Sequence, residues 1–207
     1  MAKKITRKPK PEISDRILDM ALALAAERGW RRVAMTDIAA AAKAPLAEVL
    51  LTFPSKGAVV NAIFKRTDAR VLATAVAGET GDSTRDNLFN VLMQRFDTLQ
   101  RDRQGISSIV SASLCDPLAP LCYGPRLMSS MALMLETAGL SSSGPGNFLR
   151  AKGLAVVYVI AFRVWLLDDS PDMTKTMASL DGGLKRAETL AALCWGRRVD
   201  QAAFVKS

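Results

Sequence analysis

Histidine, the side chain most often used for proton transfer and metal binding, does not occur in this 207-residue sequence. A Ser–His or Cys–His nucleophile pair is therefore excluded within it, and a zinc site would lack its usual imidazole ligand. The three cysteines, Cys115, Cys122 and Cys194, form no C-x-x-C pair, and an odd number closes no disulfide framework. This usage is typical of a reducing compartment, so we expect a cytoplasmic protein with no metal site and no cofactor.

Carboxylates, the other common acid–base groups, cluster at Asp168, Asp169 and Asp172. The surrounding sequence LLDDSPDM indicates the end of one helix and the start of another, with Ser170 as N-cap and Pro171 in the first helical position. An acid in the first turn is favoured by the helix dipole. We therefore interpret these acids as solvated capping residues, and we predict that the chain is not an enzyme.

Basic residues are concentrated near the N-terminus of a chain whose formal net charge is +8. Residues 1–12 have no apolar core of signal-peptide length and are predicted to form a disordered basic arm. The longest apolar run, LAVVYVIAFRVWLL at 154–167, is 14 residues long and contains Arg163. Such a run is too short to cross a bilayer and fits a buried helix, so we expect no membrane span.

Every long segment has the apolar spacing of an α-helix, and no hairpin turn separates alternating apolar residues. The predicted fold class is therefore all-α, with about nine helices. We expect these helices over 13–28, 35–42, 45–51, 55–78, 84–103, 106–114, 121–138, 148–168 and 171–195.

Four short motifs follow one another near the N-terminus: R-I-L-D-M-A (16–21), E-R-G-W (27–30), M-T-D-I-A (35–39) and F-P-S-K (53–56). In this order and spacing they resemble the TetR family of one-component transcriptional regulators. Two later segments are similar to some of these proteins: V-W-L-L-D-D-S-P-D (164–172) and L-D-G-G-L-K-R-A-E (180–188). The resemblance implies a three-helix, helix-turn-helix DNA-binding head over 13–56, a helical effector-binding and dimerisation domain over 57–207, and repression that a small apolar molecule relieves.

The segment APLAEVLLTFPSK takes the place of the recognition helix, which meets base edges in the major groove. It departs from the family pattern. Lys43 replaces the usual glycine, Pro45 a Ser or Thr, and Leu46 a frequent Lys or Arg, while Leu50 and Thr52 replace an aromatic residue and a histidine.

The charge of this region is unfavourable for DNA, because residues 34–53 offer only Lys43 against Asp37 and Glu48. Ala34 also stands where an N-capping Ser or Thr is usual, which costs about 1 kcal/mol unless Thr36 takes over the cap.

Two interpretations of this shortage of charge remain open. In the first, the basic arm and Lys56 contact phosphates, while Leu46, Ala47 and Thr52 touch thymine methyls or read DNA shape. The residues predicted to contact operator DNA are Lys3, Lys4, Arg7, Lys8, Thr36, Lys43, Pro45, Leu46, Ala47, Leu50, Thr52 and Lys56. In the second, the motif is degenerate, as in lipid-binding proteins of ubiquinone biosynthesis that share the TetR fold and look similar at Gly29-Trp30 and at W-L-L-D-D.

Methionine and aromatic residues are spread over the later helices as in adaptable apolar pockets, although the same residues fill ordinary cores. The predicted effector pocket consists of Leu92, Arg95, Phe96, Ile109, Leu114, Met128, Met131, Tyr158 and Phe162. Arg95 and Arg163 lie on largely apolar helices, and either would need a partner if buried. A small apolar effector with a carboxylate, such as a fatty acid, would supply one.

A narrow apolar seam with 4-3 spacing runs along 171–195, and the helix at 148–168 is apolar nearly all round. Two such helices are predicted to pair with a second copy in the four-helix interface of a homodimer. The residues predicted for this interface are Val157, Ala161, Trp165, Met173, Met177, Leu180 and Leu184.

Overall fold

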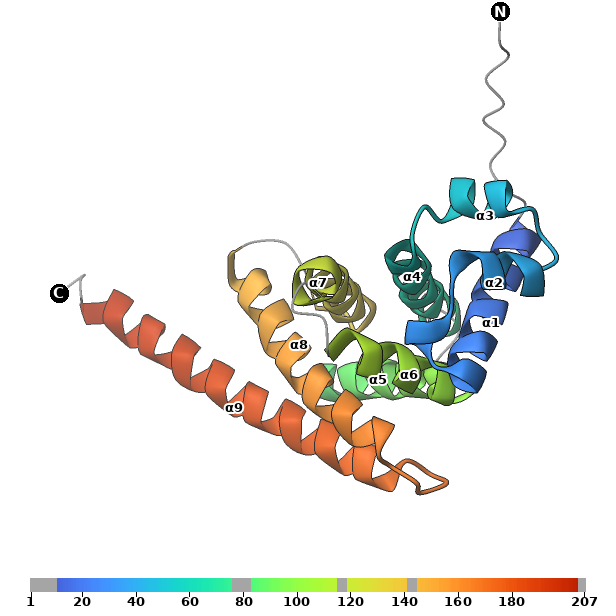
Figure 1. Ribbon diagram of the computed structural model, residues 1–207. Helices are drawn as coiled ribbons and strands as arrows, with labels where there is room; N and C mark the ends of the chain where they lie inside the picture. The colour runs from blue at the N-terminus through green and yellow to red at the C-terminus, as the bar shows by residue number, and fades with distance from the viewer. Residues whose placement is uncertain (1–10, 76–82, 115–118, 141–144, 205–207) are drawn as a thin grey trace, which may run out of the picture. The chain divides into compact units, whose positions relative to one another are not determined.

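Figure 1 shows the computed structural model, which describes residues 11–75, 83–114, 119–140 and 145–204. Within these ranges the chain is all-α, as the sequence predicts. Its elements are α1 (Pro11–Arg28), the 3-10 turn η1 (Trp30–Arg32), α2 (Met35–Ala41), α3 (Leu46–Thr52), α4 (Lys56–Ala75), α5 (Thr84–Gln100), α6 (Arg103–Leu114), α7 (Ala119–Thr137), α8 (Pro145–Leu166) and α9 (Thr174–Phe204). All boundaries except the end of α9 lie within three residues of the predicted ones.

The described residues fall into two compact units. The first lies within Met1–Arg70 and Thr98–Arg126, and the second within Val71–Asp97 and Leu127–Ser207. Helices α4, α5 and α7 therefore each contribute residues to both units. The predicted division of the chain at residues 56 and 57 stays a prediction.

Helices α1 and α6 pack closely in the first unit. Ile17, Ala21 and Ala25 recur every fourth residue on α1, so they share one face, and all three are fully buried. Helix α6 meets α1 at Gly105, where a Cβ atom would lie 2.5 Å from the backbone oxygen of Leu22. The close approach of the two helices therefore requires glycine at this position.

The junction between α1 and α2 is fixed by Gly29 and Trp30. Gly29 follows the last residue of α1 with a φ of +83°, a conformation that glycine adopts without strain. Trp30 then enters the core with 5% of its surface exposed, and its backbone N–H donates to Ser108 Oγ at 2.8 Å. The 3-10 turn is thereby attached to α6.

Helices α8 and α9 lie side by side in the second unit (Figure 1). Ala161, Trp165 and Leu180 are completely buried. The helices approach closely at Gly183, where a Cβ atom would lie 2.7 Å from Val157 Cγ1. The seam through these residues is therefore covered within one chain.

Asp168, between α8 and α9, is buried with 1% of its surface exposed, so the prediction of a solvated acid is wrong for this residue. Thr176 donates its backbone N–H and its hydroxyl to Asp168 Oδ2 at 2.8 and 2.7 Å, and Ser170 donates both of its own groups to Oδ1. Burial alone would raise the pKa of Asp168, but these hydrogen bonds outweigh burial and hold the pKa well below its usual range.

The start of α9 also differs from the prediction, because the helix begins at Thr174 rather than at Pro171. Ser170 nevertheless acts near the helix start, since its Oγ accepts the backbone N–H of Thr174 at 2.9 Å. Asp169 and Asp172 are exposed, in agreement with the prediction for these two acids.

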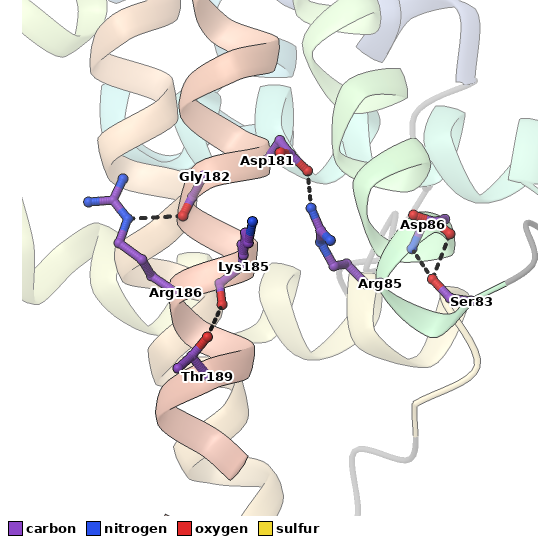
Figure 2. A network of polar contacts seen from close by, with 8 residues as sticks. All are labelled: Ser83, Arg85, Asp86, Asp181, Gly182, Lys185, Arg186 and Thr189. Atoms are coloured by element: carbon purple, nitrogen blue, oxygen red, sulfur yellow. Dashed lines mark hydrogen bonds and ion pairs between the residues drawn. The ribbon is translucent and has the colours of Figure 1, made fainter. Parts of the chain in front are cut away.

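Polar contacts on the surface of the second unit are shown in Figure 2. Arg85 of α5 forms an ion pair with Asp181 of α9. Ser83 caps the start of α5 by accepting the backbone N–H of Asp86 at 3.1 Å and donating to the carboxylate of the same residue at 2.6 Å. These contacts join and cap helices of the second unit.

Candidate nucleic-acid interface

Helices α2 and α3 are joined by a tight turn in the first unit. Lys43 has a φ of +49°, and the backbone N–H groups of Lys43 and Ala44 donate to the carbonyls of Ala40 and Ala39 at 3.1 and 3.0 Å. This is the helix-ending arrangement in which glycine is usual, and a residue with a side chain costs about 1 kcal/mol there. The chain keeps the turn geometry and gains an exposed ammonium group.

The N-terminus of α2 is capped by Asp37, whose Oδ2 accepts the backbone N–H of Ala34 at 2.7 Å. The sequence offers Thr36 as an alternative cap for this helix. Thr36 is exposed, however, and Asp37 at the third helical position accepts the free N–H instead. An acid that seemed unfavourable for DNA binding thus has a structural role.

Helix α3 has one buried side and one exposed side. Val49 is fully buried, and Phe53, which follows the helix, is 9% exposed. Leu51 is 87% exposed, Leu50 40% and Leu46 38%. The exposed side, called the apolar face of α3 below, consists of Leu46, Ala47, Leu50 and Leu51.

The polar side chains of α3 lie beside this face. Glu48 and Thr52 are half-buried, and the Thr52 hydroxyl donates to the Glu48 carbonyl at 2.8 Å. Pro45, also exposed, is the N-cap residue of α3.

Lys56, at the start of α4, is engaged within the protein. Its Nζ donates to the Trp30 carbonyl at 2.6 Å and lies 4.5 Å from the centre of the Trp30 ring. Partial burial lowers the pKa of Lys56, and the nearby Asp37 carboxylate opposes this effect. Lys56 therefore attaches α4 to η1 in this structure, and its predicted contact with a phosphate stays a prediction.

Other basic groups of the helix-turn-helix region face solvent. Arg31, Arg32 and Lys43 are exposed. Residues 11–63 contain six bases and six acids, whereas residues 1–10 contain five bases and no acid. Lys3, Lys4, Arg7 and Lys8 lie outside the described residues. Most of the net positive charge at this end of the chain belongs to the arm.

A cavity of about 500 Å³ opens beside the end of α3. It is lined by Thr52, Phe53, Ala58, Asn61, Ala62, Lys65, Pro125 and Arg126. Arg126 of α7 forms an ion pair with the buried Asp68 of α4, and burial lowers the pKa of Arg126. Sequence reasoning missed this contact, because nothing in the chain connects positions 68 and 126 before the helices are packed.

The predicted effector pocket coincides in part with an aromatic core in the second unit. The Phe96 ring centre lies 5.4 Å from that of Tyr158 and 5.9 Å from that of Trp165. Arg95 is 2% exposed, its Nε donates to the Tyr158 hydroxyl at 3.0 Å, and its guanidinium lies 5.3 Å from the Tyr158 ring centre. Arg163 is exposed. The buried arginine is thus Arg95.

The other predicted pocket residues do not all gather there. Leu92 and Met131 are fully buried in the second unit, and Met128 and Phe162 are half-buried. Ile109 is buried in the first unit. The side chain of Leu114 lies outside the described residues. The pocket therefore stays a prediction.

The predicted dimer interface stays a prediction, because most of its residues are buried within the single chain and none is seen against a partner. Val157, Ala161, Trp165, Met173, Leu180 and Leu184 are buried within the single chain, and only Met177 is exposed. Their seam is covered by the packing of α8 and α9 on each other and by the rest of the second unit. Exposed apolar side chains lie instead at other positions of the two helices: Phe148, Leu149, Val156, Val159, Ile160, Met177 and Leu190.

No group of three His, Cys, Asp or Glu residues with the geometry of a metal site occurs among the described residues. Within the same ranges no single helix is long and apolar enough to span a membrane. Helices α3 and α4 satisfy that criterion only when taken together, and they are bent by 62° relative to each other.

Two short helices joined by a tight turn, packed on a longer helix and exposing one side of the second short helix, define a helix-turn-helix domain. Residues 17–63, which include α2 and α3, match the model of the bacterial regulatory proteins of the tetR family. The helix-turn-helix region therefore matches the family that its sequence motifs predict. No curated protein matches the sequence.

Solved structures extend this similarity beyond the helix-turn-helix. A TetR transcriptional regulator from Nitrosomonas europaea is 25% identical, with a TM-score of 0.71 over 87% of this chain and 99% of that one. A TetR transcriptional regulator from Rhodococcus sp. RHA1 is 18% identical, with a TM-score of 0.62 over 85% and 96% of the two chains. The multidrug binding protein EbrR, solved with imidazole, is 21% identical, with a TM-score of 0.54 over 88% and 97%.

Proposed function

We propose that the chain is a one-component transcriptional regulator of the cytoplasm, acting as a repressor that binds double-stranded operator DNA as a homodimer. The observation that carries the proposal is the helix-turn-helix of the TetR family with one side of its second helix exposed. The regulator would have no catalytic activity of its own. The basic arm and the exposed bases Arg31, Arg32 and Lys43 would neutralise phosphates.

The homodimer would form through the apolar side chains that α8 and α9 leave exposed. Val156, Val159 and Ile160 are 60%, 42% and 53% exposed on α8. Apolar side chains gathered on one helix in this way are typical of a surface covered by a partner. Two-fold pairing of this surface would place it against its own copy and would present two helix-turn-helix domains to one operator.

The effector would be a small apolar molecule held in the second unit near the aromatic core. Arg95 supports a ligand with a carboxylate, such as a fatty acid, because a cation that has already been desolvated binds an anion strongly. Helix α4 contributes residues to both units, so a ligand that displaces it would alter the helix-turn-helix domain. Coupling of this kind is typically about 1–3 kcal/mol.

A lipid carrier of TetR fold is the second candidate function, and the apolar face of α3 is the observation that favours it. A helix that has lost its DNA-reading residues would keep the fold and expose an apolar surface. In that case the helix-turn-helix would bind no DNA, and the chain would present a lipid to an enzyme of quinone or lipid biosynthesis.

The test is a binding titration of the full-length protein against duplexes from its own upstream region and against random duplexes, at several salt concentrations. We expect sequence-preferring binding that weakens steeply with salt. Deletion of residues 1–10 should reduce affinity and salt dependence, and Lys43→Ala should do so more weakly. Lys175→Ala, which removes an exposed lysine of the second unit, is the matched control. Equal weak binding to every duplex would favour the lipid carrier, and co-purified lipid would then be analysed.

A further inference from the structure

The apolar face of α3 is unusual for the exposed side of a helix. Successive helical residues are about 100° apart, so residues 46, 47, 50 and 51 occupy one continuous side. Within Leu46–Thr52, all of which the structure describes, no polar side chain lies on that side. Exposed helix faces normally carry polar or charged residues.

The hydrogen-bonding groups of α3 are also poorly suited to reading bases. Glu48 can only accept hydrogen bonds and is half-buried, and the Thr52 hydroxyl already donates within the helix. Arg, Lys, Asn and Gln, which form the bidentate contacts with guanine and adenine, do not occur in Leu46–Thr52. The four side chains of the exposed face offer only hydrocarbon.

The major groove presents one apolar group to such a face, the C5-methyl group of thymine. We propose that α3 reads its operator through thymine methyl groups, with Leu46 and Leu50 as specificity-determining residues and Ala47 permitting close approach. This inference rests on the proposed function. The position of α3 as the second helix of a helix-turn-helix favours DNA over a lipid or protein as the occupant of this face.

Two leucines of the apolar face lie next to each other, with an exposed lysine nearby in the chain. Leu46 and Leu50 are four residues apart and therefore neighbours on one side of the helix, and their exposures, 38% and 40%, are nearly equal. Lys43 lies exposed in the turn before α3, where a cation can contact the phosphate backbone that borders the groove. Phosphate contacts and base contacts are thereby assigned to different residues.

The test replaces thymine by deoxyuracil, which removes only the methyl group and keeps the base pairing and the other groove atoms. Duplexes preferred by the full-length protein are first selected from a random pool, and each thymine is then replaced in turn. At a contacted thymine we expect an affinity loss of about fourfold, the effect of one buried methyl-sized group. Thymines outside the contacted positions should show no loss.

Leu46→Ala and Leu50→Ala should each abolish the difference between thymine and deoxyuracil at one position of the half-site. Both side chains are exposed, so these variants should fold, and far-ultraviolet circular dichroism would verify it. Lys43→Ala is the matched control, because it should weaken binding to both duplexes equally and preserve the difference.

Three outcomes would overturn the inference. Equal affinity for the preferred duplex with thymine and with deoxyuracil would exclude recognition of methyl groups and would not affect the proposed function. A methyl effect that persists in both leucine variants would assign the reading to residues outside α3. Absence of any preferred duplex would overturn the proposed function as well, and the apolar face would then belong to a lipid or protein partner.

Discussion

Helices α3 and α8 both expose apolar side chains, but they do so on very different scales. Helix α3 is 7 residues long and exposes one short face, whereas α8 is 22 residues long and exposes Leu149, Val156, Val159 and Ile160 along its length. A short convex face suits the major groove, while a long helix surface suits another helix. Exposure of apolar residues therefore does not by itself identify the partner, and the length and setting of the helix must be considered.

A charge placed on each face in turn should have different effects on the two helices. Ile160→Asp should raise the dimer dissociation constant by about three orders of magnitude, because each copy would bury an unpaired carboxylate in the two-fold interface. Leu50→Asp should leave the dimer intact and prevent DNA binding through repulsion from phosphates. Analytical ultracentrifugation and duplex titration would measure the two effects. Loss of dimer in Leu50→Asp would contradict the separation of the two faces.

Asp168 stabilises the junction between α8 and α9 through its hydrogen bonds to Ser170 and Thr176. Asp168→Asn should lower the free energy of unfolding at neutral pH by about 2–3 kcal/mol, because charge-assisted hydrogen bonds are lost. Since the folded-state pKa of Asp168 is depressed, its contribution is present above the unfolded pKa of about 4 and is lost as pH falls below that value.

Urea unfolding at neutral and acidic pH would therefore show the difference between wild type and Asp168→Asn shrinking as the pH is lowered. Asp172→Asn, at an exposed position in the same junction, is the control and should differ little from wild type at either pH. An Asp168→Asn effect of the same size at both pH values would show that the charge of Asp168 is not what stabilises the junction.

The apolar face of α3 belongs to the first unit, which the close packing of α1 and α6 stabilises. Gly105→Ala should destabilise the protein by about 1–3 kcal/mol, because the added Cβ meets the Leu22 backbone and the helices must separate. The same change at Gly153, where a Cβ atom would meet nothing within 4 Å, should stabilise by up to about 1 kcal/mol through helix propensity. Thermal unfolding of both variants would measure the contrast, and equal effects would refute it.

The smallest effect is expected at the turn before α3. Lys43→Gly should stabilise the protein by about 0.5–1 kcal/mol, since it removes the side chain from a left-handed conformation. The same variant should weaken DNA binding, because the exposed ammonium group is lost. Stabilisation together with unchanged DNA affinity would show that Lys43 contacts no phosphate.

Sequence reasoning predicted the helices and the family, because apolar periodicity and a set of ordered motifs are local signals. It could not decide which acids of LLDDSPDM are buried, since Asp168 and Asp169 are adjacent and only packing separates them. The sequence predicts an apolar seam through Leu180 and Leu184, and both residues are buried within the single chain. Periodicity shows that a face is covered, and it does not distinguish a helix of the same chain from one of a second copy.

The site was predictable to a similar extent. The position of α3 followed from the motifs, and its shortage of charge was evident in the sequence. The attachment of Lys56 to the Trp30 carbonyl and the ion pair between Asp68 and Arg126 join residues distant in sequence, so they become visible only when the first unit is packed.

Site-specific photo-crosslinking would identify what covers the apolar face of α3 and the exposed surface of α8. A photo-reactive amino acid would replace Ala47 on the apolar face of α3 or, as the matched position, Val156 on α8. With a preferred duplex present, we predict that position 47 forms an adduct with DNA and that position 156 forms a covalent protein dimer. Crosslinking of position 47 to lipid or to a second protein chain, with no DNA adduct, would show that α3 does not read DNA.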